Sequence, residues 1–232
     1  MILNFLGCGC AYRPQFGNTC AWLSVDGRVF LFDCGETVFT RLLQTGLLER
    51  CRSLTVLVTH CHADHAGSLP TLISYMHNVE QKPVAVYYPG EDVRTLMTCC
   101  GIAVDECEFY SGANIVFAPG IRCSAFPVEH HPDLHCYGYH FICGPESFYY
   151  SGDARRLPPG VLDAFLNGRI RELYQDSTFL EDQGASHGSL DYLSAVIPPG
   201  LRRNVYPMHF SGDFSGQLRA RGFGVCMEPL GR

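Results

Sequence analysis

The chain has 232 residues, a formal net charge of −6, 17% charged residues and 47% hydrophobic residues, a composition typical of globular rather than disordered proteins. It contains no run of 18 apolar residues, and its first residues lack the basic start and cleavage site of a signal peptide. Lys82 is the only lysine and the arginines are scattered, which argues against a broad surface for long nucleic acid. The 13 irregularly spaced cysteines are typical of reduced thiols. We therefore predict a cytoplasmic protein without a membrane segment.

In the first half of the chain, short apolar runs alternate with helical patterns. Ile2–Leu6 predicts a strand, and Cys20–Val25 and Val29–Phe32 flank Asp26-Gly27, a dipeptide typical of two-residue hairpins. The apolar spacing then predicts a helix at Glu36–Leu48, a strand at Leu54–Thr59, a helix at Ala66–Val79, a strand at Val84–Tyr88 and a helix at Asp92–Cys100. This half is one block of strands followed by helices.

The second half forms another such block. Strand-like runs come first, at Glu106–Tyr110, Ile115–Phe117, Arg122–Val128, Tyr137–Cys143 and Ser147–Ser151. Then follow helical patterns at Gly160–Leu166 and Leu190–Ile197, a strand at Asn204–Met208, a short helix at Phe214–Arg221 and an edge strand at Gly224–Glu228. Two such blocks favour an α/β (α+β) fold, a four-layer αββα sandwich of two mixed sheets. No low-complexity linker separates them, so we predict a single domain over residues 1–232.

Four candidate metal ligands cluster directly after the apolar strand Leu54–Val58, in the segment Thr59-His60-Cys61-His62-Ala63-Asp64-His65. His60 and His62 can face one side of such a loop, while Asp64 and His65 face the other, so one loop can serve two neighbouring cations. Imidazoles together with a carboxylate suit Zn²⁺, and Mn²⁺ or Fe²⁺ less selectively. The alternative is a polar loop that is rich in histidine by chance.

This HxHxDH segment resembles the signature of the metallo-β-lactamase superfamily. Further segments resemble the ribonuclease Z branch of that superfamily: Phe5-Leu6-Gly7-Cys8-Gly9, Asn18-Thr19, Phe32-Asp33-Cys34-Gly35-Glu36, Tyr137-Gly138-Tyr139, Ser151-Gly152-Asp153, Asp176-Ser177-Thr178 and Met208-His209-Phe210-Ser211. The resemblance extends from about residue 5 to residue 211, which is nearly the whole chain. It implies a metal-dependent hydrolase with the αββα fold.

The resemblance also implies the remaining ligands. The segment before His130 resembles the strand that ends in the family's third histidine, and we favour His130 over the adjacent His131 because it alternates in phase with Val128 and Phe126. Asp153 resembles the carboxylate that bridges two metals, and His209 the last histidine ligand. The implied arrangement is His60, His62 and His130 on one metal, Asp64, His65 and His209 on the other, and Asp153 between them.

Two divalent metals, expected to be Zn²⁺, lower the pKa of a shared water and so provide hydroxide for attack on a phosphodiester. Protonation of the leaving group remains to be explained. In the ribonuclease Z branch a carboxylate orients a histidine that acts on the leaving oxygen, and Asp176 and His187 match these two positions. Asp176 stands where the branch usually has Glu. The resemblance therefore implies Asp64, Asp176 and His187 as catalytic residues.

The substrate class is left open by the sequence. Members that process tRNA carry a long arm between the third histidine and the bridging aspartate, whereas only residues 131–152 separate His130 from Asp153 here. A related group without the arm, including cyclic-nucleotide phosphodiesterases used by phages against nucleotide-signalling defence, is equally similar. We therefore predict hydrolysis of a small phosphodiester or cyclic nucleotide, with a tRNA 3′-end endoribonuclease, a thioester or lactone hydrolase and a metal-free binding module as alternatives.

Two further predictions concern phosphate binding and assembly. Arg155 and Arg156 directly follow the turn that contains Asp153, so they are placed either to bind phosphate as bidentate donors or to form a solvated surface pair. Members of the resembled branch are commonly homodimers, and the resemblance therefore implies a homodimer.

Overall fold

The first hairpin forms where Asp26-Gly27 predicts it. The computed structural model describes residues 1–103, 105–183 and 186–226. Val25 pairs with Arg28 across the turn, and Asp26 (φ 50°) and Gly27 (φ 77°) both adopt positive φ. Positive φ at both central residues is the requirement of a type I′ hairpin turn, whose twist matches that of the flanking strands.

Six strands form the first sheet, in the spatial order of the chain. They are β1 (Asn4–Gly7), β2 (Cys20–Val25), β3 (Arg28–Phe32), β4 (Ser53–Leu57), β5 (Val84–Tyr87) and β6 (Glu108–Tyr110). The helices of this half are α1 (Val38–Thr45), α2 (Leu47–Arg50), α3 (Ala63–Ala66), α4 (Leu69–Tyr75), a π-helical turn (Met76–Glu80) and α5 (Asp92–Cys99), and a 3₁₀ turn lies at Pro14–Phe16. The strands from β3 to β6 are mutually parallel.

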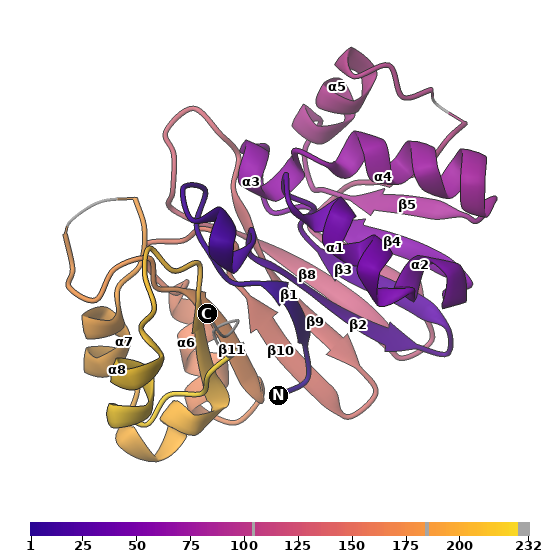
Figure 1. The fold of residues 1–232 in the computed structure, drawn as a ribbon. Coiled ribbons are helices and arrows are strands. Elements are labelled where there is room, and N and C mark those ends of the chain that lie inside the picture. Colours follow the sequence, from indigo (N-terminus) through magenta and orange to yellow (C-terminus); the bar gives the residue numbers. More distant parts are fainter. Residues whose placement is uncertain (104, 184–185, 227–232) are drawn as a thin grey trace.

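The second sheet also has six strands, in the order β12-β11-β10-β9-β8-β7. They are β7 (Asn114–Ala118), β8 (Ile121–Pro127), β9 (Tyr137–Cys143), β10 (Glu146–Tyr150), β11 (Glu172–Asp176) and β12 (Val205–Met208). Helices α6 (Pro159–Leu166), α7 (Leu190–Val196) and α8 (Ser215–Ala220) accompany it, with a 3₁₀ turn at Pro199–Asn204. Figure 1 shows the two sheets with the purple helices on one outer side and the orange and yellow helices on the other. This arrangement confirms the predicted αββα sandwich.

Alternating side chains bury both faces of the first sheet. On β3, Phe30 and Phe32 point into the core between the sheets, whereas Val29 and Leu31 pack against the helices outside. Phe141 of the second sheet meets both phenylalanines, with ring centroids 5.1 and 5.7 Å away. Because side chains in a strand alternate with period two, a continuous apolar run such as Val29–Phe32 is needed to fill both layers.

Two predicted helices are each interrupted in the structure. The helix predicted at Glu36–Leu48 is divided at Gly46, which has φ 62° and ends α1. The helix predicted at Ala66–Val79 is replaced by α3, which starts three residues earlier, by α4 and by the wider π turn. Pro70 at the beginning of α4 fits a helix start, where its missing amide hydrogen leaves no intrahelical bond unmade.

The sequence patterns did not predict β11. Its sequence is Glu-Leu-Tyr-Gln-Asp, so three of its five residues are polar, yet Gln175 and Asp176 are fully buried. The strand forms because it lies between two parallel neighbours, β10 and β12, that satisfy its backbone. The edge strand predicted at Gly224–Glu228 is absent over Gly224–Cys226, and residues 227 and 228 lie outside the described residues.

The strand directions bring the ends of six strands to one edge of the sandwich. β3, β4 and β5 are parallel in the first sheet, and β10, β11 and β12 are parallel in the second. Ligands in α/β proteins bind beyond the carboxyl ends of such strands. Among the residues that the structure describes, no helix has both the length and the hydrophobicity needed to cross a bilayer.

Candidate metal centre and active site

The histidine-rich loop begins where β4 ends. His60 is fully buried, and His62 has the extended conformation that precedes α3. The helix then turns the chain, since the amide of His65 donates to the carbonyl of His62 (3.0 Å). This turn directs Asp64 and His65 toward the interior, where both are buried.

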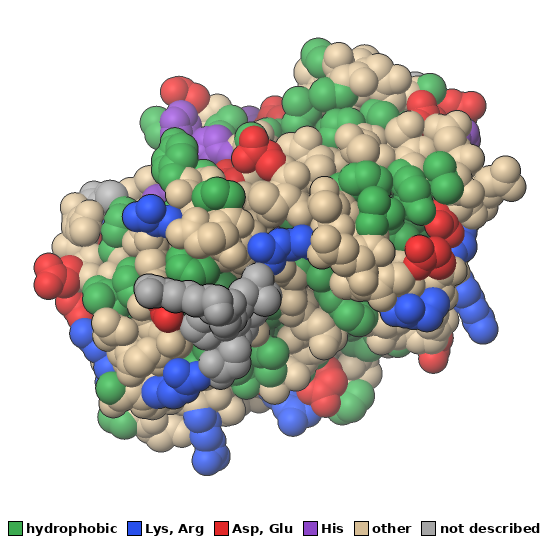
Figure 2. Space-filling model, viewed as in Figure 1, with side chains coloured by type: hydrophobic (Ala, Val, Ile, Leu, Met, Phe, Trp, Pro, Cys, Tyr) green, Lys and Arg blue, Asp and Glu red, His purple; other side chains and the backbone are tan. Residues whose placement is uncertain are grey.

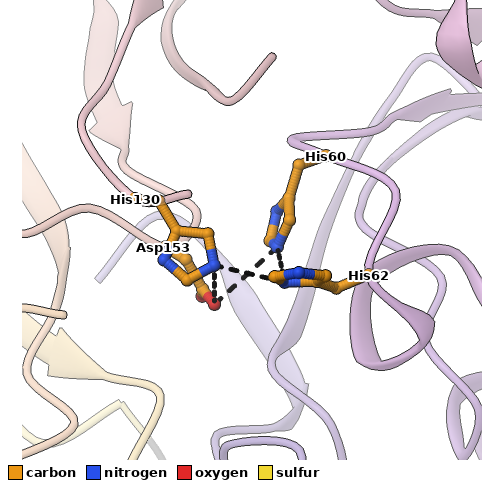
Figure 3. Close-up of side chains that lie close together, drawn as sticks. All are labelled: His60, His62, His130 and Asp153. Atoms are coloured by element: carbon orange, nitrogen blue, oxygen red, sulfur yellow. Dashed lines mark hydrogen bonds and ion pairs between the residues drawn. The ribbon is translucent and has the colours of Figure 1, made fainter. Parts of the chain in front are cut away.

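One group of ligands lies on the outer side of Asp153. It consists of His60, His62, His130 and Asp153, and in Figure 3 their imidazole nitrogens and the carboxylate point toward one another. The Nε2 atoms of His60 and His130 lie 3.8 and 3.5 Å from Asp153 Oδ2. His62 Nδ1 lies 2.9 Å from His60 Nε2 and 3.2 Å from His130 Nε2. Two nitrogens bound tetrahedrally to one zinc are about 3.3 Å apart, so these separations suit a shared cation.

The second group lies deeper and uses the other oxygen of Asp153. His65 Nε2 and His209 Nε2 lie 3.1 and 3.2 Å from Asp153 Oδ1. The same two nitrogens lie 3.4 and 3.2 Å from Asp64 Oδ2. Asp153 therefore presents one carboxylate oxygen to each group, the arrangement expected of a bridging ligand. All seven residues that the sequence indicated as metal ligands meet at this place.

The chemistry of this cluster fits divalent cations. His65 Nε2 and Asp153 Oδ1 are buried and face each other at 3.1 Å in an ion pair, and neither makes a hydrogen bond of regular geometry. Burying such polar groups is costly unless a further group also satisfies them. Burial lowers the pKa of His60 well below its ordinary value and that of His130 to about 4, so both rings are neutral and able to coordinate. A cation on either side of Asp153 would satisfy these groups.

The carboxylates around His65 favour its charged form. Burial disfavours its charged form, but the carboxylates of Asp153, Asp33 and Asp64 outweigh burial and raise the pKa of His65 well above its ordinary value. His65 Nδ1 donates to Asp33 Oδ2 (2.9 Å), which leaves Nε2 facing the cluster. His65 Nδ1 is thus committed to Asp33, and Nε2 is the atom that would hold a cation.

His131, the alternative to His130, lies outside the cluster. It is exposed, and its ring centroid is 5.6 Å from that of His62. The reason given for preferring His130 was wrong, however, because β8 ends at Pro127 and strand alternation does not extend to residue 130. A loop places His130 instead, and its Nδ1 faces the carbonyl of Ser186 (3.4 Å).

Asp33 supports the loop from the neighbouring strand, a role that the sequence patterns did not reveal. It follows β3 with φ 67°, and its carboxylate accepts hydrogen bonds from the Thr59 amide (2.7 Å) and the Thr59 hydroxyl (3.0 Å). The same hydroxyl lies 3.1 Å from His60 Nδ1. The available signal was a charged residue directly after an apolar run. The structure shows that this carboxylate is fully buried, so it requires several donors.

His187 and Asp176 form a pair beside the cluster. His187 Nδ1 donates to Asp176 Oδ2 (2.9 Å), and the His187 ring stacks on that of His209 with centroids 5.1 Å apart. Burial opposes the charged form of His187, but the Asp176 carboxylate outweighs it and raises the pKa of His187 to about 9. Asp176 therefore favours the charged form of His187 and commits its Nδ1 to the shared hydrogen bond.

The two arginines after Asp153 differ in their surroundings. Arg156 forms an ion pair with Asp182, and its guanidinium lies 4.3 Å from the centre of the Tyr192 ring. Arg155 is anchored through its amide to the carbonyl of Glu129 (3.0 Å), and its Nε is buried without a partner among the described residues. Arg156 is thus already paired with a carboxylate of the same chain, and phosphate binding by the two arginines stays a prediction.

Comparison with known proteins supports the resemblance to the ribonuclease Z branch of the metallo-β-lactamase superfamily. Residues 1–228 match the profile of the family described as anti-Pycsar protein Apyc1. The anti-Pycsar protein Apyc1 of Paenibacillus harenae is 29% identical over 247 aligned positions, which cover 100% of this chain and 99% of that protein. Ribonuclease BN of Escherichia coli O6:K15:H31 (strain 536 / UPEC) is 30% identical, over 85% of this chain and 67% of that protein.

Solved structures show the same fold. The short form of human tRNase Z superposes with a TM-score of 0.73 at 19% identity, covering 99% of this chain and 98% of that one. A diphosphatase from the PhnP family gives a TM-score of 0.73 at 19% identity, covering 98% of this chain and 95% of that one. These matches and the profile that spans nearly the whole sequence confirm the resemblance, and the chain belongs to the anti-Pycsar protein Apyc1 family, within the ribonuclease Z-like branch of the metallo-β-lactamase-fold hydrolases.

Proposed function

We propose that this hydrolase is a metal-dependent phosphodiesterase that cleaves a small phosphodiester, specifically a cyclic nucleotide. The observation that carries the proposal is the His187–Asp176 hydrogen bond (2.9 Å) directly beside Asp153. Cleavage of a phosphodiester expels an alkoxide, which needs a proton far more than a thiolate does. The buried Asp176 holds His187 charged and oriented to supply that proton.

The ligand set supports two zinc ions, with Mn²⁺ or Fe²⁺ as alternatives. His60, His62 and His130 would hold one ion, Asp64, His65 and His209 the other, and Asp153 both. When bound, such ions supply Lewis acidity toward phosphate oxygens and activate the attacking water. Asp64 contributes a negative charge from the start of α3, and His187 Nε2 is the atom from which the leaving oxygen would take its proton.

Three observations favour a small substrate over tRNA. Only a loop and the β9–β10 hairpin connect His130 to Asp153, so nothing there resembles a long arm. On the face shown in Figure 2, the basic side chains (Lys and Arg, blue) are dispersed among other residue types rather than gathered in one patch. The chain aligns with nearly all of the anti-Pycsar protein, which supports a link to cyclic nucleotides, but with only 67% of ribonuclease BN.

A tRNA 3′-end endoribonuclease is the second candidate, because the ribonuclease BN relative is 30% identical over 85% of the chain. A thioester or lactone hydrolase of the same superfamily is the third candidate.

The homodimer stays a prediction, which a measurement of molar mass by light scattering would test. A cytoplasmic location is likewise proposed.

A substrate panel tests the proposal. Purified, zinc-loaded protein is assayed with bis-p-nitrophenyl phosphate, cyclic mononucleotides, a tRNA precursor and a glutathione thioester. We expect turnover of a cyclic mononucleotide and of bis-p-nitrophenyl phosphate, with the tRNA precursor intact. Cleavage of the tRNA precursor without cyclic-nucleotide hydrolysis would favour the second candidate, and cleavage of the thioester alone would overturn the phosphodiesterase assignment.

A further inference from the structure

The side chain of Thr178 lies between the metal cluster and the proposed proton donor. Thr178 follows β11 by two residues and is buried. Its hydroxyl donates to Asp176 Oδ1 (2.8 Å) and lies 2.8 Å from His209 Nδ1. Without this hydroxyl the two groups would not meet, because His209 Nδ1 and Asp176 Oδ1 are 3.9 Å apart, beyond hydrogen-bonding distance.

The donor in each of the two hydrogen bonds of the Thr178 hydroxyl can be assigned from chemistry alone. An ionised carboxylate only accepts hydrogen bonds, so the single hydroxyl proton of Thr178 is directed to Asp176. The Thr178 oxygen must then accept from His209, which places the proton of that ring on Nδ1. The other ring nitrogen, His209 Nε2, is the atom that faces Asp64 and Asp153.

Thr178 also holds the backbone that carries His209. His209 adopts φ 65°, a left-handed conformation that a residue with a side chain takes only when its surroundings enforce it. The amide of Ser211 donates to the Thr178 carbonyl (3.2 Å), and the Ser211 hydroxyl donates to the same oxygen (2.5 Å). Thr178 therefore holds the turn around His209 by two groups: its hydroxyl contacts the imidazole, and its carbonyl accepts hydrogen bonds from Ser211.

We propose that Thr178 is a positioning residue that couples the metal centre to the proton donor. Its hydroxyl fixes His209 with Nε2 directed at Asp64 and Asp153, and it fixes Asp176, whose other oxygen holds His187. One hydroxyl thus orients both a proposed metal ligand, His209, and the carboxylate of the His187–Asp176 pair. The inference rests on the proposed phosphodiesterase function, and it adds a residue to which that function assigned no role.

Thr178→Val and Thr178→Ser isolate the hydroxyl, because valine keeps the branched shape and both variants keep the backbone contacts. With Thr178→Val we expect zinc to be lost to a chelator about 10- to 100-fold more readily, as for other groups that orient metal ligands. We also expect a lower kcat at unchanged KM. Thr178→Ser should restore both properties. Ser177→Ala is the control, because its buried hydroxyl has no partner among the described residues.

Wild-type resistance to the chelator in Thr178→Val would overturn the proposal, and so would a serine variant as impaired as valine, which would indicate packing alone. If Thr178→Val does not fold, NMR of histidine-labelled, zinc-loaded wild type decides: a His209 Nδ1 proton that exchanges slowly with water, as a buried hydrogen bond requires, supports the proposal, and a rapidly exchanging or absent Nδ1 proton overturns it. Wild-type protein that binds no metal would instead count against the proposed function itself.

Discussion

Among single residues, Asp153 and His187 have separable roles. Asp153 lies between the two ligand groups with one oxygen toward each, and is fully enclosed. His187 belongs to neither proposed ligand set: its Nδ1 lies 3.8 Å from Asp153 Oδ2 and is bonded to Asp176 instead. Loss of the His187 ring should therefore leave the proposed metal ligands complete while removing the proposed proton donor.

His187→Ala tests this separation. We expect the variant to retain its metal and to lose about 10²- to 10⁴-fold in kcat, the contribution typical of a general acid. Metal content is measured by elemental analysis and turnover with a cyclic mononucleotide. His77→Ala, at an exposed histidine on the π turn, is the matched control and should change neither quantity. Full activity of His187→Ala would exclude the general-acid role.

The pH dependence of turnover tests the partner carboxylate. His187 donates a proton only in its charged form, so kcat should fall as pH rises through the pKa of His187, which Asp176 raises to about 9. In Asp176→Asn the negative charge is gone, and the fall in kcat should move to lower pH. An alkaline limb at the same pH in both proteins would show that another group donates the proton.

Among the structural elements, the segment after β3 and the loop after β4 pack backbone against backbone. The Cys34 amide donates to the His65 carbonyl (2.7 Å), and the Ser68 amide donates to the Cys34 carbonyl (3.1 Å). Gly35 allows this approach, because a Cβ at that position would lie 1.9 Å from the Asp64 backbone oxygen. The position of the histidine-rich loop thus depends on a residue that carries no candidate ligand.

Gly35→Ala should therefore displace this loop. We expect a destabilisation of about 1–3 kcal/mol, as for other overpacked sites, together with weaker metal retention. Gly160→Ala in α6 is the control, since a Cβ there meets nothing within 4 Å and alanine favours a helix. Thermal unfolding and chelator titration measure the two effects. Equal behaviour of both variants would contradict the proposed close packing at Gly35.

For the whole molecule, the cluster joins the two halves of the sandwich. Asp64 and His65 come from the first half of the chain, whereas Asp153 and His209 come from the second. A ligand that binds only the folded chain stabilises it by mass action, by about 2.7 kcal/mol when its free concentration is 100-fold above its Kd. Bound metal should therefore hold both halves of the fold together.

Metal removal tests this linkage. Treatment with a chelator should lower the midpoint of thermal unfolding by several degrees, since about 1 kcal/mol corresponds to roughly 2–4 °C in a domain of this size. Addition of Zn²⁺ should restore the midpoint. Asp153→Asn serves as the comparison, because it removes a ligand of both groups and should make the midpoint insensitive to the chelator. An unchanged midpoint in wild type would argue against a bound metal.

The sequence determined the features that depend on neighbouring residues. Asp26-Gly27 specified the first hairpin, and the spacing of His60, His62, Asp64 and His65 indicated a metal-binding loop, because a short segment fixes how its own side chains are directed. The resemblance then supplied the ligands from distant segments. The resemblance and the alternating apolar runs together were sufficient to predict the αββα sandwich.

Only the tertiary structure decided what depends on distant contacts. Strand β11 escaped prediction because its buried Gln175 and Asp176 make hydrogen bonds with partners outside the strand, namely the Ala154 carbonyl and amide. The choice of His130 over His131 came from a loop whose path no periodicity describes. Thr178 meets His209 across 31 positions of the sequence. Local patterns specify elements and residue types, whereas the packing of strands determines which side chains share one site.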